Sequence, residues 1–231
     1  MEVFPNGFTL AVPDGCFPLG TDTMALGHFA NIPKRGRCLD LGSGCGALGI
    51  LLCSTRPDIS VTGLELNPTA HDAAMENIRR NALAARMESI CGDIREVPKL
   101  FPTGRFDVCV SNPPYYPGGP ASRQTPYARR NDFCALSDLM RAAAWATKFG
   151  GDFFLVHKPE FLEDILVEAR AAGFAAKRLC LLRHKPGLPV SLILVGLRKG
   201  GKPGMKWEEQ TLYSENGQPS QFYKNIYHME E

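Results

Sequence analysis

Short apolar runs alternate with amphipathic segments along the middle of the chain, which predicts strands that alternate with helices. Strands are expected at Arg37–Leu41, Ile59–Glu65, Ser89–Cys91, Phe106–Val110 and Asp152–His157. Helices are expected at Ala47–Ser54, Pro68–Asn81, Leu136–Lys148 and Pro159–Ala172. Such alternation is typical of a Rossmann-like, doubly wound α/β fold, in which right-handed crossovers join the strands of a mainly parallel sheet.

The two ends of the chain are less regular. A short amphipathic helix is expected after Thr21 or Asp22, either of which can cap it. Ala175–Leu182 and Ser191–Leu197 are expected to form a closing hairpin, so that the last strand of a seven-stranded sheet runs antiparallel. We therefore expect a single domain over residues 1–231, with an N-terminal cap at 1–36, a Rossmann-like core at 37–198 and a C-terminal extension at 199–231. The pattern leaves open whether this extension is docked or partly disordered.

The composition is that of an ordinary globular chain. Among the 231 residues 22% are charged and the net charge is +2, so any surface that attracts nucleic acid must be local. The eight cysteines form no Cys-x-x-Cys pair and mostly lie in apolar runs, which favours buried, reduced thiols over a disulfide framework or a metal site. The sequence shows no secretory signal and no apolar run of membrane-spanning length, so the expected location is the cytoplasm.

A glycine-rich turn follows the first expected strand. It has the sequence Gly42-Ser43-Gly44-Cys45-Gly46, and it joins the strand that contains Asp40 to a helix. Glycines in such a turn permit positive φ and let a ligand approach the backbone closely. A dinucleotide site would show G-x-G-x-x-G, whereas the glycines here alternate, which disfavours a nicotinamide dehydrogenase.

Acidic residues stand at the ends of the next two strands. Glu65 lies about twenty residues after the glycine turn, where an acid can bind both ribose hydroxyls of a nucleoside cofactor. Asp93 follows the third strand, and it can either meet an adenine amine or serve as a turn residue or helix cap. The sequence leaves both interpretations of Asp93 open.

The fourth strand leads into the stretch Asn112-Pro113-Pro114-Tyr115. Asn112 offers an amide that both donates and accepts, and the two prolines offer only carbonyl acceptors on a stiff backbone. Tyr115 supplies a flat face on which a base can stack. These groups suit a planar amine at the carboxyl end of a strand, where doubly wound folds bind ligands. Taken alone, the stretch is equally well a proline-rich turn.

Together these motifs resemble class I S-adenosylmethionine-dependent methyltransferases. Leu39–Gly46 is similar to motif I of that superfamily, and Asn112–Tyr115 is similar to the catalytic motif of members that methylate planar nitrogens. Those members act on adenine in DNA or RNA, guanine in ribosomal RNA and glutamine in release factors. Further stretches resemble the bacterial tRNA(Val) adenine-37 N6-methyltransferase family over essentially the whole chain: Gly20–Thr23, Ala128–Arg130, His157–Glu160, Lys199–Gly204 and Tyr213–Gly217.

The resemblance implies S-adenosylmethionine as the cofactor and the exocyclic N6 of an adenine in RNA, most simply adenine 37 of tRNA(Val), as the methyl acceptor. It implies catalytic roles for Asn112, Pro113, Pro114 and Tyr115. The cofactor is expected to contact residues at the strand ends, namely Asp40, Gly42, Ser43, Gly44, Gly46, Glu65, Leu66, Asp93, Ile94 and Asn112.

The tRNA is expected to contact residues that follow the catalytic motif or lie near the C-terminus: Tyr116, Arg123, Arg129, Arg130, Lys199 and Lys202. Each of the basic side chains, taken singly, is better explained as a solvated surface charge than as a specific contact, but a group of them beside a base-binding motif can supply affinity for phosphates. One departure from the family is Arg130-Asn131, which stands where a His-Glu pair often follows. We expect no metal and no membrane partner, and a monomer or weak homodimer.

Three alternative functions remain open. Protein glutamine N5-methyltransferases present a similar planar nitrogen, but they usually carry a separate N-terminal helical domain, and only about thirty residues precede the core here. Amino-methyltransferases of ribosomal RNA or DNA share the same motif. A non-catalytic S-adenosylmethionine-binding RNA module is disfavoured, because such a module does not need the acceptors of Asn112–Tyr115.

Overall fold

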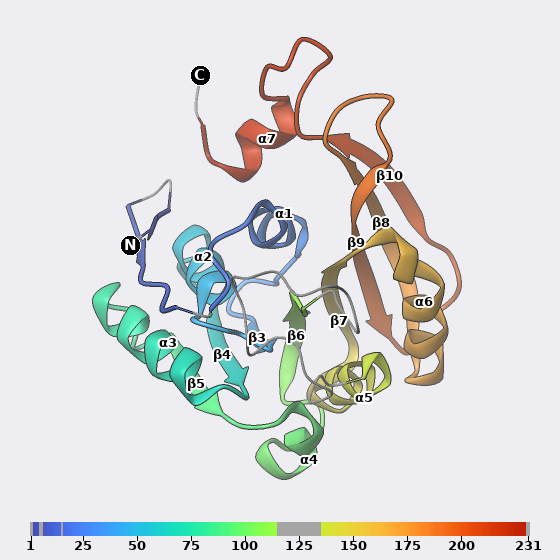
Figure 1. The fold of residues 1–231 in the computed structure, drawn as a ribbon. Coiled ribbons are helices and arrows are strands. Elements are labelled where there is room, and N and C mark those ends of the chain that lie inside the picture. Colours follow the sequence, from blue (N-terminus) through green and yellow to red (C-terminus); the bar gives the residue numbers. More distant parts are fainter. Residues whose placement is uncertain (1, 5–6, 15, 115–134, 230–231) are drawn as a thin grey trace.

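A computed structural model describes residues 2–4, 7–14, 16–114 and 135–229. A sheet of eight strands forms the centre of the molecule (Figure 1). In spatial order its strands are β10 (Lys206–Thr211), β8 (Phe174–Arg183), β9 (Val190–Lys199), β7 (Thr147–His157), β6 (Phe106–Ser111), β3 (Arg37–Leu41), β4 (Ser60–Glu65) and β5 (Met87–Cys91). Strand β9 runs antiparallel to both of its neighbours, and the remaining neighbours pair in parallel.

This sheet confirms the predicted Rossmann-like class and the closing antiparallel hairpin. The predicted number of seven strands was one too low, because β10 of the C-terminal extension pairs in parallel with β8. The sequence of β10 is Lys-Trp-Glu-Glu-Gln-Thr, which has no alternation of apolar and polar residues. Its strand conformation depends on pairing with the edge of β8, which hydrophobic periodicity does not reveal.

Helices cover both faces of the sheet, and each face has its own apolar core. One core joins the sheet to α1 (Thr21–Phe29), α2 (Ala47–Thr55), α3 (Pro68–Arg80) and α7 (Gln221–Ile226). The other core joins it to α4 (Val97–Leu100), α5 (Leu136–Ala146) and α6 (Leu162–Ala171). Successive residues of a strand point to opposite faces, so Cys38 lies in the first core and Leu39 in the second. Short 3₁₀ turns η1 (Ile94–Glu96) and η3 (Pro159–Phe161) follow β5 and β7.

The helix predicted to end at Lys148 ends two residues earlier, because β7 begins at Thr147. Thr147 is fully buried, its hydroxyl donates to Cys109 Sγ at 3.1 Å, and it pairs with Phe106 in the sheet. The register then shifts between Phe106 and Val108, and Gly150 and Gly151 lie in this irregular first part of β7. A buried, β-branched threonine that pairs across the sheet explains the early change from helix to strand.

Two asparagines of α3 hold the N-terminal segment, in which β1 (Glu2–Val3) and β2 (Thr9–Leu10) form a small hairpin. Asn77 accepts from the Ala11 backbone N–H at 2.8 Å and donates to its carbonyl at 2.9 Å. One turn later, Asn81 makes the same pair of bonds with Thr9. The spacing of four residues places both amides on one side of the helix, where they replace a neighbouring strand.

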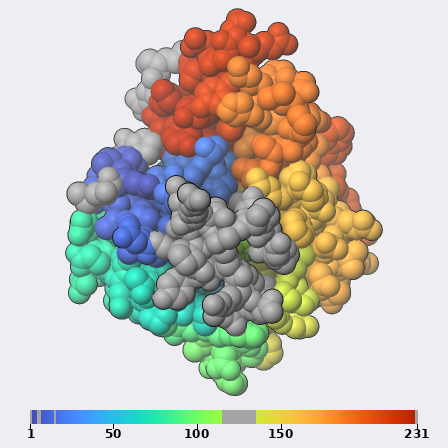
Figure 2. All heavy atoms as spheres, viewed as in Figure 1, coloured from blue at the N-terminus to red at the C-terminus, as the bar shows by residue number. Residues whose placement is uncertain are grey.

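The C-terminal extension is docked, which answers the question that the sequence left open. Leu212 and Ile226 are buried in the core, and α7 packs against α1. The rings of Tyr213, Tyr223 and Tyr227 follow one another, with centroids 5.1 and 4.5 Å apart. The space-filling view shows these red C-terminal residues directly beside the blue N-terminal part of the chain (Figure 2).

We expect Asn77→Ala to lower the free energy of unfolding by roughly 2–3 kcal/mol, because it leaves buried backbone partners at Ala11 and Cys45 unsatisfied. Urea unfolding followed by circular dichroism measures this loss. Asn31→Ala, at an exposed position, is the matched control and should change stability by less than about 0.5 kcal/mol. Equal stability of the two variants would show that the amide does not anchor the N-terminal segment.

Candidate active site

The carboxyl ends of β6, β3 and β4 lie side by side, because these strands are consecutive neighbours in the sheet. Two contacts join the ends. Ser111 Oγ, at the end of β6, donates to the Leu41 carbonyl of β3 at 2.7 Å. The backbone N–H groups of Gly42 and Ser43 donate to the Leu64 carbonyl of β4 at 2.9 and 3.1 Å. The glycine turn, Glu65 and Asn112 therefore share one edge of the sheet, as the sequence predicted.

The glycine turn presents bare backbone at this edge. Gly42, Gly44 and Gly46 have φ values of 75°, 55° and 88°, a region that disfavours side chains. A Cβ atom built on Gly42 or Gly44 would meet nothing within 4 Å, so a ligand can approach the backbone there. Gly46 is the N-cap of α2. The positive φ angles predicted for this turn are confirmed.

Glu65 braces the glycine turn. Its Oε2 accepts from the Gly44 N–H at 2.7 Å, and its Oε1 accepts from the Asn67 N–H at 2.8 Å. The carboxylate is half-buried and retains further acceptor capacity, because each oxygen has two lone pairs. Binding of ribose hydroxyls by Glu65 stays a prediction, and bracing of the turn is a second role that sequence reasoning missed.

Asp40 is a buried carboxyl with an unsatisfied oxygen. The residue is only 1% exposed, and Oδ2 has no hydrogen-bond partner among the residues that the structure describes. Burial, and secondarily the negative charge of Glu65, raises the pKa of Asp40 to about 7. A buried carboxyl oxygen of Asp40 without a partner, near the second acid Glu65, is energetically unfavourable. A cationic ligand bound beside the two acids would reduce this cost.

Ser43 also has a buried oxygen, Oγ, without a hydrogen-bond partner in the described part of the chain. Its hydroxyl packs on Gly63 of β4, where an added Cβ would lie only 2.7 Å from Ser43 Oγ. Any larger residue at position 63 would therefore displace Ser43 from the turn. Sequence reasoning missed Gly63; the only signal was a glycine inside a strand, which often marks a close approach.

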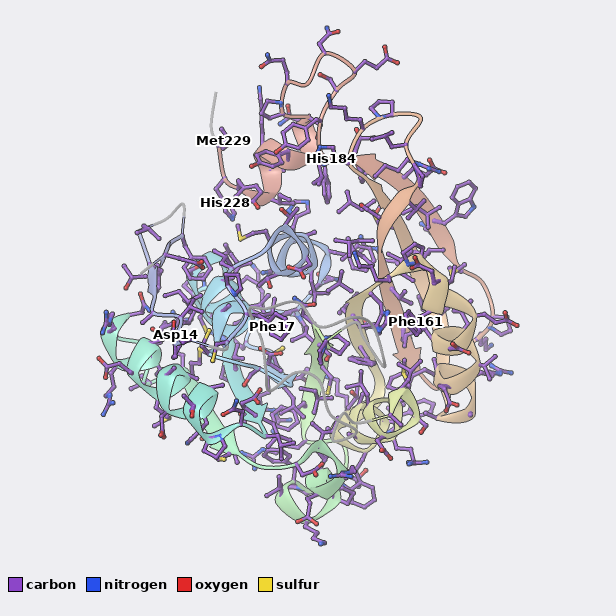
Figure 3. All side chains as sticks on the ribbon, in the orientation of Figure 1. Asp14, Phe17, Phe161, His184, His228 and Met229 are labelled. Carbon is purple, nitrogen blue, oxygen red and sulfur yellow. The ribbon has the colours of Figure 1, made fainter. Side chains whose placement is uncertain are left out.

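Two apolar side chains flank the acids. Leu66 follows Glu65 and is 50% exposed, and Ile94 is half-buried at the start of η1. The segment before α1 adds Phe17, which is 56% exposed and whose carbonyl lies 4.0 Å from Cys45 Sγ of the glycine turn (Figure 3). Exposed apolar groups near polar ones are typical of sites that take a flat, partly apolar ligand.

Asp93 is engaged within its own turn. Its Oδ1 accepts from the Arg95 N–H at 2.8 Å as the N-cap of η1, and both oxygens accept from Arg95 Nε, at 3.0 and 2.9 Å. Hydrogen bonding from the Arg95 side chain lowers the pKa of Asp93. Of the two interpretations that the sequence left open, these contacts favour the helix cap.

Asn112 stands at the end of β6, directly after Ser111. It is half-buried, and its Nδ2 donates to Thr23 Oγ1 of α1 at 3.1 Å. Pro113 is half-buried and Pro114 is exposed. The other residues predicted to catalyse or to bind RNA after this motif lie outside the described residues: Tyr115, Tyr116, Arg123, Arg129 and Arg130.

Lys199 and Lys202 do not border Asn112 as expected. Lys199 pairs with Phe174 at the start of β8, and its Nζ donates to the carbonyl of Thr147, the first residue of β7. Because β9 runs antiparallel, its carboxyl end lies where the parallel strands begin, at the edge of the sheet opposite the glycine turn. The antiparallel closing strand predicted from the sequence implies this position of Lys199, which the expected contact beside Asn112 did not take into account.

The described residues contain no group of three or more His, Cys, Asp or Glu side chains placed to hold a metal ion. Nor does the described part of the chain include a helix long and apolar enough to cross a membrane.

The residues at this edge fit S-adenosylmethionine. The two buried oxygens without partners and the acid pair suit a ligand with a positively charged sulfonium and ammonium group. The open backbone at Gly42 and Gly44 gives such a ligand room. This fold and this site define a Rossmann-like S-adenosylmethionine-dependent methyltransferase.

Comparison with known proteins agrees with this class. The model of the methyltransferase small domain family matches residues 19–169. The tRNA1(Val) (adenine(37)-N6)-methyltransferase of Tolumonas auensis is 32% identical over 83% of this chain and 80% of its own length. The protein of the same name from Bacteroides fragilis is 31% identical, over 77% of this chain and 75% of its own length. The chain belongs to the methyltransferase small domain family, and these relatives confirm the family resemblance predicted from the sequence.

Solved structures support the fold. A predicted O-methyltransferase from Agrobacterium tumefaciens superposes with a TM-score of 0.75 at 20% identity, covering 90% of this chain and 96% of its own. A geranyl diphosphate C-methyltransferase from Streptomyces coelicolor, solved with S-adenosyl-L-homocysteine, superposes with a TM-score of 0.56 at 12% identity, covering 74% of each chain. At such identities the likeness concerns the fold alone.

We expect Asp40 to make the cofactor-free protein less stable as the pH rises. Its pKa is raised from 3.8 to about 7, so between these values the folded protein keeps a proton that the unfolded chain has released, and stability falls with rising pH. Asp40→Asn removes this dependence. Relative to wild type it should gain on the order of one kcal/mol per pH unit across the window, a few kcal/mol in total.

Urea unfolding at several pH values between 4 and 8 measures this difference. Asp72→Asn, at an exposed position on α3, is the matched control. A pH-independent difference between Asp40→Asn and wild type would contradict the raised pKa.

Proposed function

We propose that this methyltransferase acts on the exocyclic N6 of an adenine in RNA, and specifically on adenine 37 of tRNA(Val). The observation that carries the proposal is the position of Asn112, which ends β6 beside the glycine turn and the two acids, with Pro113 next to it. The relatives from Tolumonas auensis and Bacteroides fragilis are named for methylation of adenine 37 in tRNA1(Val), which supports this adenine as the acceptor.

The chemical difficulty lies in the adenine amine, whose lone pair is delocalised into the ring. Two hydrogen-bond acceptors close together can reduce this delocalisation of the lone pair. Asn112 Oδ1 and the Pro113 carbonyl would each accept one N6 hydrogen, which draws the nitrogen towards tetrahedral geometry and localises its lone pair. S-adenosylmethionine supplies the electrophilic methyl group on its sulfonium. Residues that hold the amine in line with that methyl group contribute mainly through positioning and electrostatics.

Asp40, Ser43, Glu65 and the glycine turn would hold the cofactor, the acids through their carboxyl oxygens and the turn through the close approach that Gly42 and Gly44 allow. The new bond joins N6 to the methyl carbon as the bond from sulfur to that carbon breaks, and one N6 proton then leaves to solvent. Tyr115 is proposed to stack on the target base, which is easier to extrude from a loop than from a duplex.

The proposal also covers further contacts with the tRNA, the cellular location and the oligomeric state. Arg123, Arg129 and Arg130 would bind tRNA phosphates near the target base, which makes the affinity for tRNA fall as the salt concentration rises. We propose that the enzyme works in the cytoplasm as a monomer or weak homodimer.

The substrate assignment predicts methylation of an unmodified tRNA(Val) transcript with adenine at position 37 and none of a transcript with guanine there. Labelled S-adenosylmethionine followed by nucleoside analysis should give N6-methyladenosine. Total RNA, DNA and protein from the host are labelled in parallel. Label in the protein fraction alone would overturn the proposal in favour of glutamine methylation, and label in DNA alone would favour a DNA methyltransferase.

Asn112→Ala is expected to lower kcat at least about 100-fold, because the acceptor that polarises the amine is lost. Its affinity for S-adenosylhomocysteine, measured by calorimetry, should stay within about threefold of wild type. Glu65→Ala is the matched comparison and should show the opposite pattern, a loss of affinity for the same ligand. If Asn112→Ala loses that affinity to the same degree as Glu65→Ala, the motif is structural rather than catalytic.

A further inference from the structure

The side-chain amide of Asn112 is held by a helix from the other end of the chain. Its Nδ2 donates to Oγ1 of Thr23, which lies 89 positions earlier in the first turn of α1. Thr23 is only 6% exposed and Asn112 is half-buried, so this bond is partly shielded from water. The hydroxyl of a helical threonine commonly donates to a carbonyl three or four residues back in its own helix. The Thr23 hydroxyl in addition accepts a hydrogen bond from the side-chain amide of Asn112, the residue directly after β6.

We propose that Thr23 is a positioning residue for methyl transfer, which sets the orientation of the Asn112 amide towards the acceptor amine. The inference rests on the proposed function, because it concerns the same reacting nitrogen. It adds a residue from outside the glycine turn and the Asn-Pro-Pro-Tyr motif to the machinery of the reaction.

The physical argument begins with the shape of the amide. A carboxamide is planar, and its oxygen and nitrogen lie on opposite branches of Cγ, so a contact that fixes Nδ2 also fixes the direction of Oδ1. With Nδ2 directed at Thr23, the oxygen is turned away from α1. The amide oxygen can accept a hydrogen bond from the adenine amine. An NH₂ group in its place is itself a donor and could not accept that hydrogen. The observed bond, in which Thr23 Oγ1 accepts from Nδ2, therefore supports the orientation that leaves Oδ1 for the amine.

The hydroxyl can act in this way because the first turn of α1 is itself anchored. Asp22 Oδ1 accepts from the Thr23 backbone N–H at 2.7 Å. Thr21 Oγ1 lies 3.0 Å from the hydroxyl of Tyr227, so the C-terminal helix α7 supports the same turn. The turn is thus held by a bond within it and by the contact of Thr21 with Tyr227, and a site residue is placed more accurately on a rigid element than on a loop.

Close packing fixes the rest of α1. Gly27 approaches Leu51 of α2 so closely that an added Cβ would lie 2.5 Å from that side chain. Phe29 at the end of the helix meets Phe154 of β7 edge-on, with ring centroids 5.8 Å apart. The position of the Thr23 hydroxyl is therefore set by contacts with two helices and the sheet, independently of Asn112.

A merely structural role for Thr23 has different consequences. If the hydroxyl only satisfied a buried amide, its loss would lower stability and cofactor affinity together. A positioning role lowers kcat while the cofactor site, at the ends of β3 and β4, keeps its affinity. The separation of kcat from cofactor binding therefore distinguishes the two roles.

The experiment compares Thr23→Val, which is similar in shape but lacks the hydroxyl, with Thr23→Ser, which restores it. Steady-state kcat and KM are measured on the tRNA transcript, and the affinity for S-adenosylhomocysteine is measured by calorimetry. Rates are divided by the calorimetric concentration of binding sites, so that unfolded protein is not counted. Thr147→Val is the control, since it removes a buried hydroxyl at the opposite edge of the sheet.

We expect Thr23→Val to lower kcat about 10- to 100-fold with cofactor affinity within about threefold of wild type. Thr23→Ser should recover kcat to within about threefold, and Thr147→Val should leave it unchanged. Thr23→Ala replaces Thr23→Val if the valine variant does not fold. The inference is overturned if kcat of the hydroxyl-free variant stays near wild type, if serine does not restore it, or if Thr147→Val loses as much.

Failure of this inference can be told apart from failure of the proposed function. If wild-type protein does not methylate adenine in tRNA, the proposed function is wrong, whatever the variants do. If wild-type protein does so and Thr23→Val matches it, the proposed function stands and only the role of Thr23 is wrong.

Discussion

The parallel pairing of β3 with β4 on one side and with β6 on the other is the constraint on which the rest of the structure depends. It aligns Asp40 with Gly63 and with Val110, so three strands end at the same level. Two features make this alignment tight. The glycine turn donates backbone hydrogen bonds to the Leu64 carbonyl, and the Ser111 hydroxyl donates to the Leu41 carbonyl. A different register at either pairing would separate the acids from Asn112 and leave no common site.

The same alignment places unfavourable groups together in the cofactor-free protein. Burial, and secondarily the negative charge of Glu65, raises the pKa of Asp40 to about 7, and Asp40 Oδ2 has no hydrogen-bond partner among the described residues. Functional sites commonly hold such strain because a ligand relieves it. Glu65 is an instructive case, since its carboxylate accepts from the backbone N–H groups of both Gly44 and Asn67 and so holds the glycine turn.

The ends of the chain complete the site from outside the core. The first turn of α1 brings Thr23 to Asn112, and Tyr227 of the docked extension supports Thr21 in that turn. The N-terminal segment is in turn tied to α3 through Asn77, whose amide also donates to the Cys45 carbonyl of the glycine turn. The described residues of both terminal segments thus contact the elements that form the site.

The sequence by itself determined the alternation of strands and helices, the glycine turn with its positive φ angles and the acid and amide residues at the strand ends, because these depend on local periodicity and residue type. It did not predict β10 or the start of β7 at Thr147, since each depends on which strand lies next to which. The contacts of Thr23 with Asn112 and of Ser43 with Gly63 were likewise decided only by the tertiary structure. They join residues far apart in the chain, and such contacts follow from strand order and register, which no local pattern encodes.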